Sequence, residues 1–385
     1  MLLAKLVTNK KVNTNRGSSM KSFNEIIYDV TKFGRKIKTS DYMGNGKYPI
    51  IDQGKNLISG YTNEENGIFV DVPAIIFGDH TRILKYIDTP FFLGADGTKI
   101  LKAKNENCNL KFIYYALKNI KIPDTGYNRH YKWLKESSII YPAIEHQDKI
   151  VNILDRITSI ITLKKQQLVF LEKLKHSLFV EMFGDTVINP LGWEEHKLEE
   201  YIDFLTSGSR GWAKYFVNEE NELFLTIKNV KNNKIVLDDI QYIKAPKNKE
   251  AERTKVKCGD LLISITADLG RTGVIDKDIS SRGAYINQHL SLVRLDQNRI
   301  NPQYISYYLE TDAGKRQFCS KNQNGVKAGL NFDAIKSLNI IVPPIELQDD
   351  FVKNIYFIDK HKSVIQKSLD ETQLLFDSLM QKYFG

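Results

Sequence analysis

The chain has 385 residues, 42% of them hydrophobic and 26% charged, which is typical of a globular protein with two or three separately folded domains. No apolar run reaches membrane length, and Met1–Val7 is too short for a signal-peptide core. The three cysteines, Cys108, Cys258 and Cys319, are too scattered for a disulfide framework or a zinc site. We therefore expect a cytoplasmic protein. The net charge of +9 lies in residues 1–143, where 22 Lys and Arg stand against 13 Asp and Glu. This charge suggests a polyanionic partner such as nucleic acid, and a merely soluble basic surface is an equal alternative on charge alone.

Residues 1–143 form a first block with mixed helix and strand signals. A short helix is predicted at 23–31 and a second at 112–117. Strands are predicted at 48–54, at 72–78 and on both sides of a turn within 91–101. The loops that follow these elements are polar, notably Asp79–Arg82 and the aromatic, basic stretch Tyr127–Lys132.

A long helix is predicted over residues 144–184. It opens after Pro142 and closes at Phe183-Gly184, which are helix start and stop signals, and it contains no internal proline or glycine. Apolar residues recur at coiled-coil spacing over its whole length. A second block, residues 185–343, follows this helix.

The second block repeats the plan of the first. An opening helix region is predicted at 193–205, strands at 223–230, 258–265 and 284–293, and a helix at 304–309 that matches 112–117. Polar loops are predicted at 207–211, 266–273 and 320–329. Asn287-Gln288-His289 falls inside the predicted strand, where a satisfied structural cluster is the favoured interpretation.

The last segment, residues 344–385, repeats the first long helix at a constant offset of 201 residues. Pro142 to Gly184 aligns with Pro343 to Gly385 without a gap, and Gln147 and Asp148 recur as Gln348 and Asp349. Seven of nine seam positions are apolar in each copy; the polar ones are Lys164 and Lys175 in the first helix, Lys362 and Thr372 in the second. Leaving aside the last apolar position of each copy, Met182 and Tyr383, we predict a seam of twelve apolar residues: Leu154, Ile157, Ile161, Leu168, Leu171, Leu178, Ile355, Ile358, Ile365, Leu369, Phe376 and Leu379.

These features predict a mixed α/β (α+β) fold of four parts: 1–143, 144–184, 185–343 and 344–385. Neither helix can bury its seam alone, so we expect the two to pair. The order block, helix, block, helix makes the pair antiparallel, with one related block at each end and pseudo-two-fold symmetry. The alternative is that two unrelated helices lie inside separate domains, which the matched register disfavours.

The organisation resembles the specificity (S) subunit of type I restriction–modification systems. The resemblance covers nearly the whole chain. Its motifs are individually weak, but they occur in the expected order, and those at the start and end of the long helix occur in both copies. The motifs are Pro343-Pro-Ile-Glu-Leu-Gln348, the closing Ser378–Gly385, Gly259-Asp-Leu-Leu-Ile-Ser264, Ala284-Tyr-Ile-Asn-Gln-His289 and Phe77-Gly-Asp-His-Thr-Arg82. The first block departs from the Gly-Asp-Leu-Leu-Ile-Ser form, having Ala74–Gly78 instead, so the two blocks are expected to read different sequences.

The resemblance implies that each block is a target recognition domain reading one half of a bipartite double-stranded DNA target. The helices would set the gap between the halves and dock two modification (methyltransferase) subunits. The chain itself would be non-catalytic and bind no cofactor or metal. S-adenosylmethionine, ATP and Mg are expected on partner subunits, the ATP on separate restriction subunits.

Residues that could read DNA lie in the polar loops. Arg suits guanine edges and phosphates, Asn and Gln suit adenine, and Lys suits phosphates. For any single residue, a solvated loop position is the competing interpretation. The candidates are Arg35, His80, Arg82, Lys85, Lys99, Arg129, Lys132, Arg210, Lys214, Thr266, Arg271, Lys321, Gln323 and Lys327.

Enzymatic motifs are absent from the sequence. There is no phosphate-binding Gly-x-x-x-x-Gly-Lys-Ser/Thr loop and no Asn/Asp-Pro-Pro-aromatic signature of amino-methyltransferases, and Glu195-His-Lys197 lacks the acidic partner of a nuclease metal site. Two alternatives nevertheless stay open. One is a single-chain DNA methyltransferase or nuclease, and the other is a coiled-coil adaptor that never touches DNA.

Overall fold

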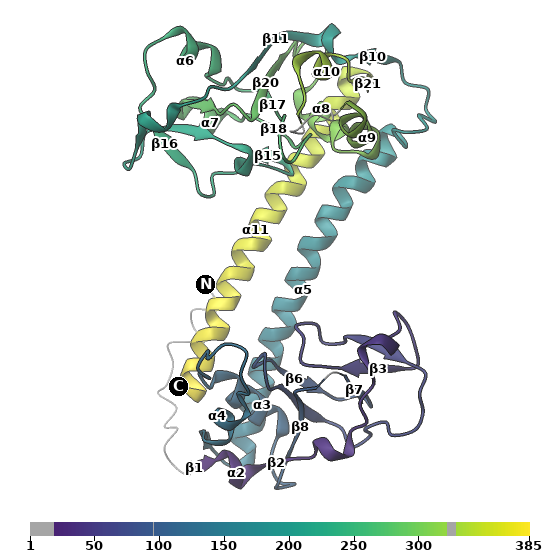
Figure 1. The fold of residues 1–385 in the computed structure, drawn as a ribbon, viewed down its shortest axis with the longest axis vertical. Coiled ribbons are helices and arrows are strands. Elements are labelled where there is room, and N and C mark those ends of the chain that lie inside the picture. The colour runs from purple at the N-terminus through teal and green to yellow at the C-terminus, as the bar shows by residue number, and fades with distance from the viewer. Residues whose placement is uncertain (1–18, 95, 322–328) are drawn as a thin grey trace. The chain divides into compact units, whose positions relative to one another are not determined.

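The computed structural model describes residues 19–94, 96–321 and 329–385, and the chain divides into two compact units. Unit 1 comprises Met1–Gln166 with Gln366–Gly385, and unit 2 comprises Gln167–Ile365. The two predicted long helices are confirmed as α5 (Ile144–Phe183) and α11 (Ile345–Phe384), each an uninterrupted helix of 40 residues (Figure 1). Each helix contributes one part to each unit. No helix in the described ranges is long and apolar enough to cross a membrane.

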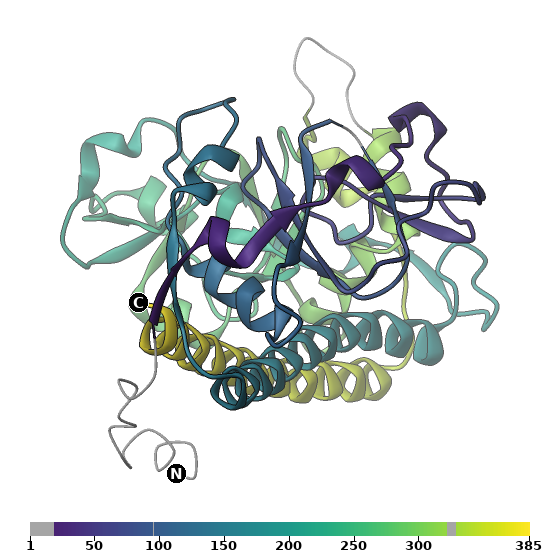
Figure 2. The same ribbon diagram turned by 90° about the horizontal axis from the view of Figure 1, so that it is seen from below.

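The described residues of unit 1 form three small sheets, which lie on one side of its helix pair (Figure 2). The main sheet has the order β2-β8-β5-β6, the second β4-β3-β7, and the third pairs β1 with β9. The strands are β1 (Ser19–Ser22), β2 (Ile27–Asp29), β3 (Tyr48–Ile51), β4 (Gly60–Thr62), β5 (Ala74–Gly78), β6 (Leu84–Ile87), β7 (Phe92–Leu93), β8 (Thr98–Ala103) and β9 (Ser138–Tyr141). The helices are α2 (Phe23–Ile26), α3 (Leu110–Asn119) and α4 (Tyr131–Lys135), with short 3-10 turns at Thr31–Phe33 and Thr39–Asp41.

Unit 2 has the same three kinds of sheet with added strands. Their orders are β11-β20-β17-β18-β15-β14, β12-β16-β13-β19 and β10-β21. The strands are β10 (Glu195–Lys197), β11 (Ile202–Ser207), β12 (Phe216–Val217), β13 (Glu222–Leu225), β14 (Val230–Lys231), β15 (Asn233–Ile235), β16 (Gln241–Ile243), β17 (Leu261–Ser264), β18 (Thr272–Val274), β19 (Ala284–Ile286), β20 (Leu290–Leu295) and β21 (Asn339–Ile341). The helices are α6 (Lys249–Thr254), α7 (Lys277–Arg282), α8 (Pro302–Leu309), α9 (Asp312–Lys321) and α10 (Phe332–Lys336), with 3-10 turns η3 (Leu198–Tyr201), η4 (Trp212–Tyr215) and η5 (Ile227–Asn229).

The two units share one topology, which confirms the predicted relation between the blocks. The order β2-β8-β5-β6 recurs as β11-β20-β17-β18, and the parallel pair β3/β7 recurs as β13/β19. Helices α3 and α4 recur as α8 and α10. The strands β12, β14 and β15 and the helices α6, α7 and α9 have no counterpart among the described elements of unit 1.

Most predicted elements are shifted by a few residues at their ends, and four differ more strongly in extent or type. The helix expected at 23–31 ends at Ile26, and β2 follows it; the region 193–205 forms β10, η3 and β11 rather than a helix. The strands expected at 223–230 and 284–293 are each interrupted. In each case pairing with strands distant in sequence outweighs the local propensity, as when β11 pairs with β20.

The repeated Gln-Asp pair fastens each long helix to a neighbouring short helix. In unit 1 Gln147 Oε1 accepts from Asn109 N–H (3.0 Å), Asp148 accepts from Asn109 Nδ2 (2.8 Å), and Gln147 Nε2 donates to Pro142 O (2.8 Å). The same three bonds recur in unit 2 at 2.9, 2.8 and 2.7 Å, now made by Asn301, Gln348, Asp349 and Pro343. Because both glutamines are fully buried, their hydrogen bonds explain why this motif occurs twice.

Replacing Asn301 by alanine should destabilise unit 2 by about 1–2 kcal/mol, the cost of a lost N-cap. Asn301 Oδ1 accepts from the first amides of α8, at 2.9 Å from Gln303 and 3.4 Å from Tyr304. Urea denaturation followed by tryptophan fluorescence measures the loss. The matched control is Asn298→Ala, because Asn298 is exposed and lies three residues before Asn301, outside the helix. An equal loss of stability in both variants would contradict the capping role.

The two long helices run antiparallel within unit 2. Glu172 of α5 forms an ion pair with Lys362 of α11. Phe179, which lies later on α5, packs on Phe351, which lies earlier on α11, so the two helices run in opposite directions. In unit 1 the polar seam residue Lys164 donates to Ser368 O (2.8 Å), Ser368 Oγ (2.7 Å) and Thr372 Oγ1 (2.6 Å). All twelve predicted apolar seam residues are buried or half-buried.

Candidate nucleic-acid interface

Three polar loops meet beside the main sheet of unit 1. They are the β5–β6 turn at 79–83, the connection between β7 and β8, of which Gly94, Asp96 and Gly97 are described, and the α3–α4 loop that ends at His130. Buried Asp79 joins them: its amide donates to Gly97 O (2.6 Å), its carbonyl accepts from His130 N–H (2.8 Å), and its carboxylate accepts from Tyr131 N–H (2.7 Å). Asp79 therefore holds the loops together rather than facing a ligand.

Side chains on top of these loops form a second set of contacts. The ring of His80 stacks on that of Tyr127, with centroids 4.5 Å apart and planes 6° apart, and Tyr127 stays 87% exposed. Gln53, which follows β3, accepts from His80 N–H (3.2 Å) and donates to Asp96 O (2.9 Å). The result is a fixed polar surface with an exposed aromatic ring, beside Arg129.

Unit 2 brings the corresponding loops together in the same way. Leu330 N–H donates to Ile265 O (3.0 Å), so the β17–β18 turn lies against the chain that leads into α10. The Asn287–His289 segment lies between β19 and β20, not inside one strand. His289 Nδ1 is 2.7 Å from Thr266 Oγ1 and its Nε2 is 2.8 Å from Gln288 Nε2, which supports a structural cluster at this position.

The predicted DNA-binding residues fall into several groups. Arg129, Lys132, Arg210 and Lys214 are exposed, and none of the four forms an ion pair with another described residue. Four more are held in ion pairs: Arg35 with Glu64, Arg82 with Asp124, Lys99 with Asp29 and Arg271 with Asp268. His80 and Thr266 lie in the loops described above, and Lys321 donates to Ser337 Oγ (2.9 Å). Gln323 and Lys327 lie outside the described residues.

Lys85 belongs to the interior rather than to this surface. It is 4% exposed, its Nζ donates to Asp52 O (2.7 Å) and lies 3.7 Å from the Asp52 carboxylate, and burial lowers its pKa. Its partner lies 33 residues away, so nothing in the local sequence marks it as internal. Lys85 is therefore not part of the surface that could contact DNA.

The structure also adds residues that were not among the predicted DNA-binding residues. Gln53 and Tyr127 complete the unit 1 surface, and Lys315 and Arg316 are exposed on α9 of unit 2. Within the described residues, no group of three or more His, Cys, Asp or Glu side chains could hold a metal ion. What the two loop groups offer is hydrogen-bond donors, acceptors and cations, the chemistry of DNA base edges and phosphates.

Family comparison agrees with this arrangement. The family model of the type I restriction modification DNA specificity domain matches residues 20–173 and again 190–371, one copy for each block and its helix. The chain belongs to this family. The double match also reproduces the repeat seen in the fold, in which both units share one sheet order.

Relatives within the specificity family are distant in sequence. The specificity subunit of the type I restriction enzyme EcoR124I/EcoR124II from Escherichia coli is 29% identical over 149 residues, 34% of this chain and 37% of that protein. The putative MjaX specificity subunit from Methanocaldococcus jannaschii is 23% identical over 212 residues, 53% of this chain and 48% of that protein. The aligned segments thus span about a third to a half of these relatives.

Solved structures match over a larger share of the chain. The S subunit of a type I restriction–modification system from M. genitalium matches with a TM-score of 0.65 at 17% identity, over 98% of both chains. A chain from a study of type I complex assembly and conformational transition matches with a TM-score of 0.55 at 17% identity, over 96% of this chain and 98% of that one. At this identity the likeness concerns the fold.

Proposed function

We propose that this chain is the DNA sequence-specificity subunit of a type I restriction–modification complex, in which each unit reads one half of a bipartite target. The observation that carries this proposal is that the same loops meet in both units but bear different side chains. Unit 1 presents His80, Tyr127 and Arg129 where unit 2 presents Thr266 and Arg271. Two related readers with different loops suit a target whose halves differ.

Exposed cations on these loops would contact phosphates and fix the register on DNA, while neighbouring polar side chains would read base edges. Arg129, Lys132, Arg210 and Lys214 are the best placed for this because they are solvent-exposed. His80, Arg82, Lys99, Thr266, Arg271 and Lys321 would contribute if DNA replaces their present partners. Arg35 is the least favoured, since Asn66 O (2.8 Å) and Glu64 (2.9 Å) both hold it.

The long helices would set the gap between the half-sites and dock two methyltransferase subunits. Apolar side chains stay exposed along both helices, on positions outside the seam. On α5 they include Ile153, Ile160, Leu163, Phe170 and Leu174, and on α11 Tyr356, Phe357, Val364 and Leu374. S-adenosylmethionine, ATP and Mg would be bound by partner subunits, while this chain would determine which DNA sequence is modified. The complex would act in the cytoplasm.

Reconstitution tests the proposal directly. The purified chain is mixed with methyltransferase subunits from the same genome and S-adenosylmethionine, and modified positions on genomic DNA are mapped by sequencing. We expect one bipartite motif with a fixed gap, seen only when this chain is present. Transfer by this chain alone, or modification without a motif, would contradict the proposal.

A further inference from the structure

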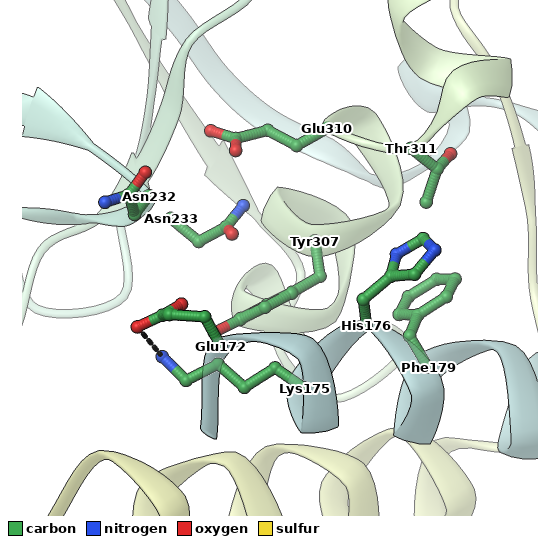
Figure 3. Close-up of a pocket in the computed structure, with 9 residues that line it drawn as sticks. All are labelled: Glu172, Lys175, His176, Phe179, Asn232, Asn233, Tyr307, Glu310 and Thr311. Carbon is green, nitrogen blue, oxygen red and sulfur yellow. Dashed lines mark ion pairs between the residues drawn. The ribbon is translucent and has the colours of Figure 1, made fainter. Parts of the chain in front are cut away.

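A cavity of about 210 Å³ opens in unit 2 between α5, the β14–β15 turn and α8. Figure 3 shows Glu310, the residue that follows α8, on the side opposite Glu172 of α5, with Tyr307 between them and His176 and Phe179 at one end. All the walls belong to unit 2. The loops of the proposed DNA surface do not line this cavity.

The acidic groups around the cavity differ in how they are balanced. Glu172 pairs with Lys362 and also with Lys175, as the dashed line in Figure 3 marks, and Lys175 pairs in turn with Asp359. Glu310 accepts hydrogen bonds from neutral groups, namely Thr272 N–H at 3.2 Å, Thr272 Oγ1 at 3.3 Å and the backbone of Asn233. Among the described residues no lysine or arginine forms an ion pair with Glu310; burial raises its pKa and outweighs the charge of Lys315, which lowers the pKa. Its carboxylate therefore lacks a directly bound cation.

Tyr307 adds a second unsatisfied group. Its hydroxyl is buried and has no hydrogen-bond partner among the described residues. Burial and the charges of Asp359, Glu172 and Glu310 raise its pKa, so it stays a neutral phenol. A buried hydroxyl without a partner is unfavourable, and a ligand that carries N–H donors would supply one.

Unit 1 does not repeat this arrangement. At the 192-residue offset between α3 and α8, Tyr307 corresponds to Tyr115 and Glu310 to Lys118. The Tyr115 hydroxyl donates to Asp155 (2.7 Å), and Lys118 lies 5.9 Å from the ring of Phe376. In unit 1 a hydrogen-bonded tyrosine and a lysine thus stand where unit 2 has the unpaired hydroxyl of Tyr307 and the carboxylate of Glu310. The repeated fold therefore does not require these two groups at the cavity.

We propose that this cavity binds an alkylguanidinium or alkylammonium group. Glu310 and Glu172 would accept its N–H donors from opposite sides, Tyr307 Oη would accept a third, and Phe179 would pack against the alkyl chain. The group could come from an arginine or lysine side chain of a bound subunit or from a free small amine. No residue of the DNA loops lines the cavity, so its occupation can be tested in the absence of DNA.

Agmatine, which carries an arginine-like guanidinium without a carboxylate, is the probe. Isothermal titration calorimetry of the purified chain should show one binding site per chain. Glu310→Gln should weaken binding at least tenfold, and Tyr307→Phe by a smaller factor, because a charged hydrogen bond contributes more than a neutral one. The matched control is Lys118→Gln, at the equivalent position of unit 1, which should leave the affinity unchanged.

The absence of agmatine binding, or equal affinity in Glu310→Gln and the unaltered chain, would overturn the proposal. Neither result depends on DNA or on partner subunits, so a failure here leaves the proposed function standing. Repeating the titration after assembly with methyltransferase subunits distinguishes the two sources. Loss of agmatine binding on assembly identifies a side chain of the bound subunit as the occupant, and unchanged binding identifies a free amine.

Discussion

Replacing Phe351 by alanine is expected to destabilise unit 2 by about 3–5 kcal/mol, the usual cost of removing a fully buried phenylalanine. Phe351 lies where the start of α11 meets the end of α5 and is 0% exposed. Its ring contacts those of Phe179, Phe183 and Tyr307, with centroids 5.3, 5.3 and 5.2 Å away. The cluster joins both long helices to α8, so a cavity there would loosen three elements together.

Urea denaturation followed by tryptophan fluorescence measures this loss. Trp193 is a suitable reporter because its Nε1 donates to Phe183 O (3.0 Å), beside the cluster. The matched control is Phe357→Ala, six residues further along α11, where the side chain is 48% exposed; we expect it to cost less than about 1 kcal/mol. Equal losses for both substitutions would show that this cluster does not hold unit 2 together.

Inserting seven residues in each long helix, after Gln166 and after Ile365, is expected to lengthen the gap of the DNA target by about three base pairs. One heptad adds about 10.5 Å of helix, and base pairs are spaced about 3.4 Å apart. Paired insertions keep the seam in register, so Lys164 still meets Ser368 and Thr372. Modification should also become weaker, because three base pairs rotate one half-site about the DNA axis.

A heptad in the first helix alone serves as the comparison. It shifts one side of the seam against the other, so the Lys175–Asp359 pair and the Lys164 contacts cannot both form. We expect this variant to lengthen the preferred gap or to lose modification. Mapping modified genomic sites gives the gap directly, and an unchanged gap in the paired variant would rule out the helices as the spacing device.

The helices were predictable because their signals are local and occur twice. Start residues, stop residues and a seven-residue seam all lie within one continuous stretch, so the bounds followed from the sequence alone. The sequence also located polar seam positions such as Lys164 and Lys175. It could not show that Lys164 bonds to Thr372 or that Lys175 pairs with Asp359, because those partners lie about 200 residues away.

The loop residues were harder to predict because burial decides their role. Lys85 and Lys132 are both lysines beside aromatic residues, yet one is enclosed with Asp52 and the other is exposed. The Asn287–His289 stretch reads as part of a strand, but β19 pairs with β13 and β20 pairs with β17, so the chain must cross between two sheets there. Such long-range pairings have no counterpart in a local pattern.

The central claim is that two independent readers are carried on one chain. Exchanging residues 185–343 for the second block of another specificity subunit, with the first block and both helices unchanged, tests it most directly. After assembly with methyltransferase subunits, sequencing of the modified sites should show one half of the motif replaced and the other half and the gap retained. A motif that changes in both halves, or does not change at all, would contradict the account.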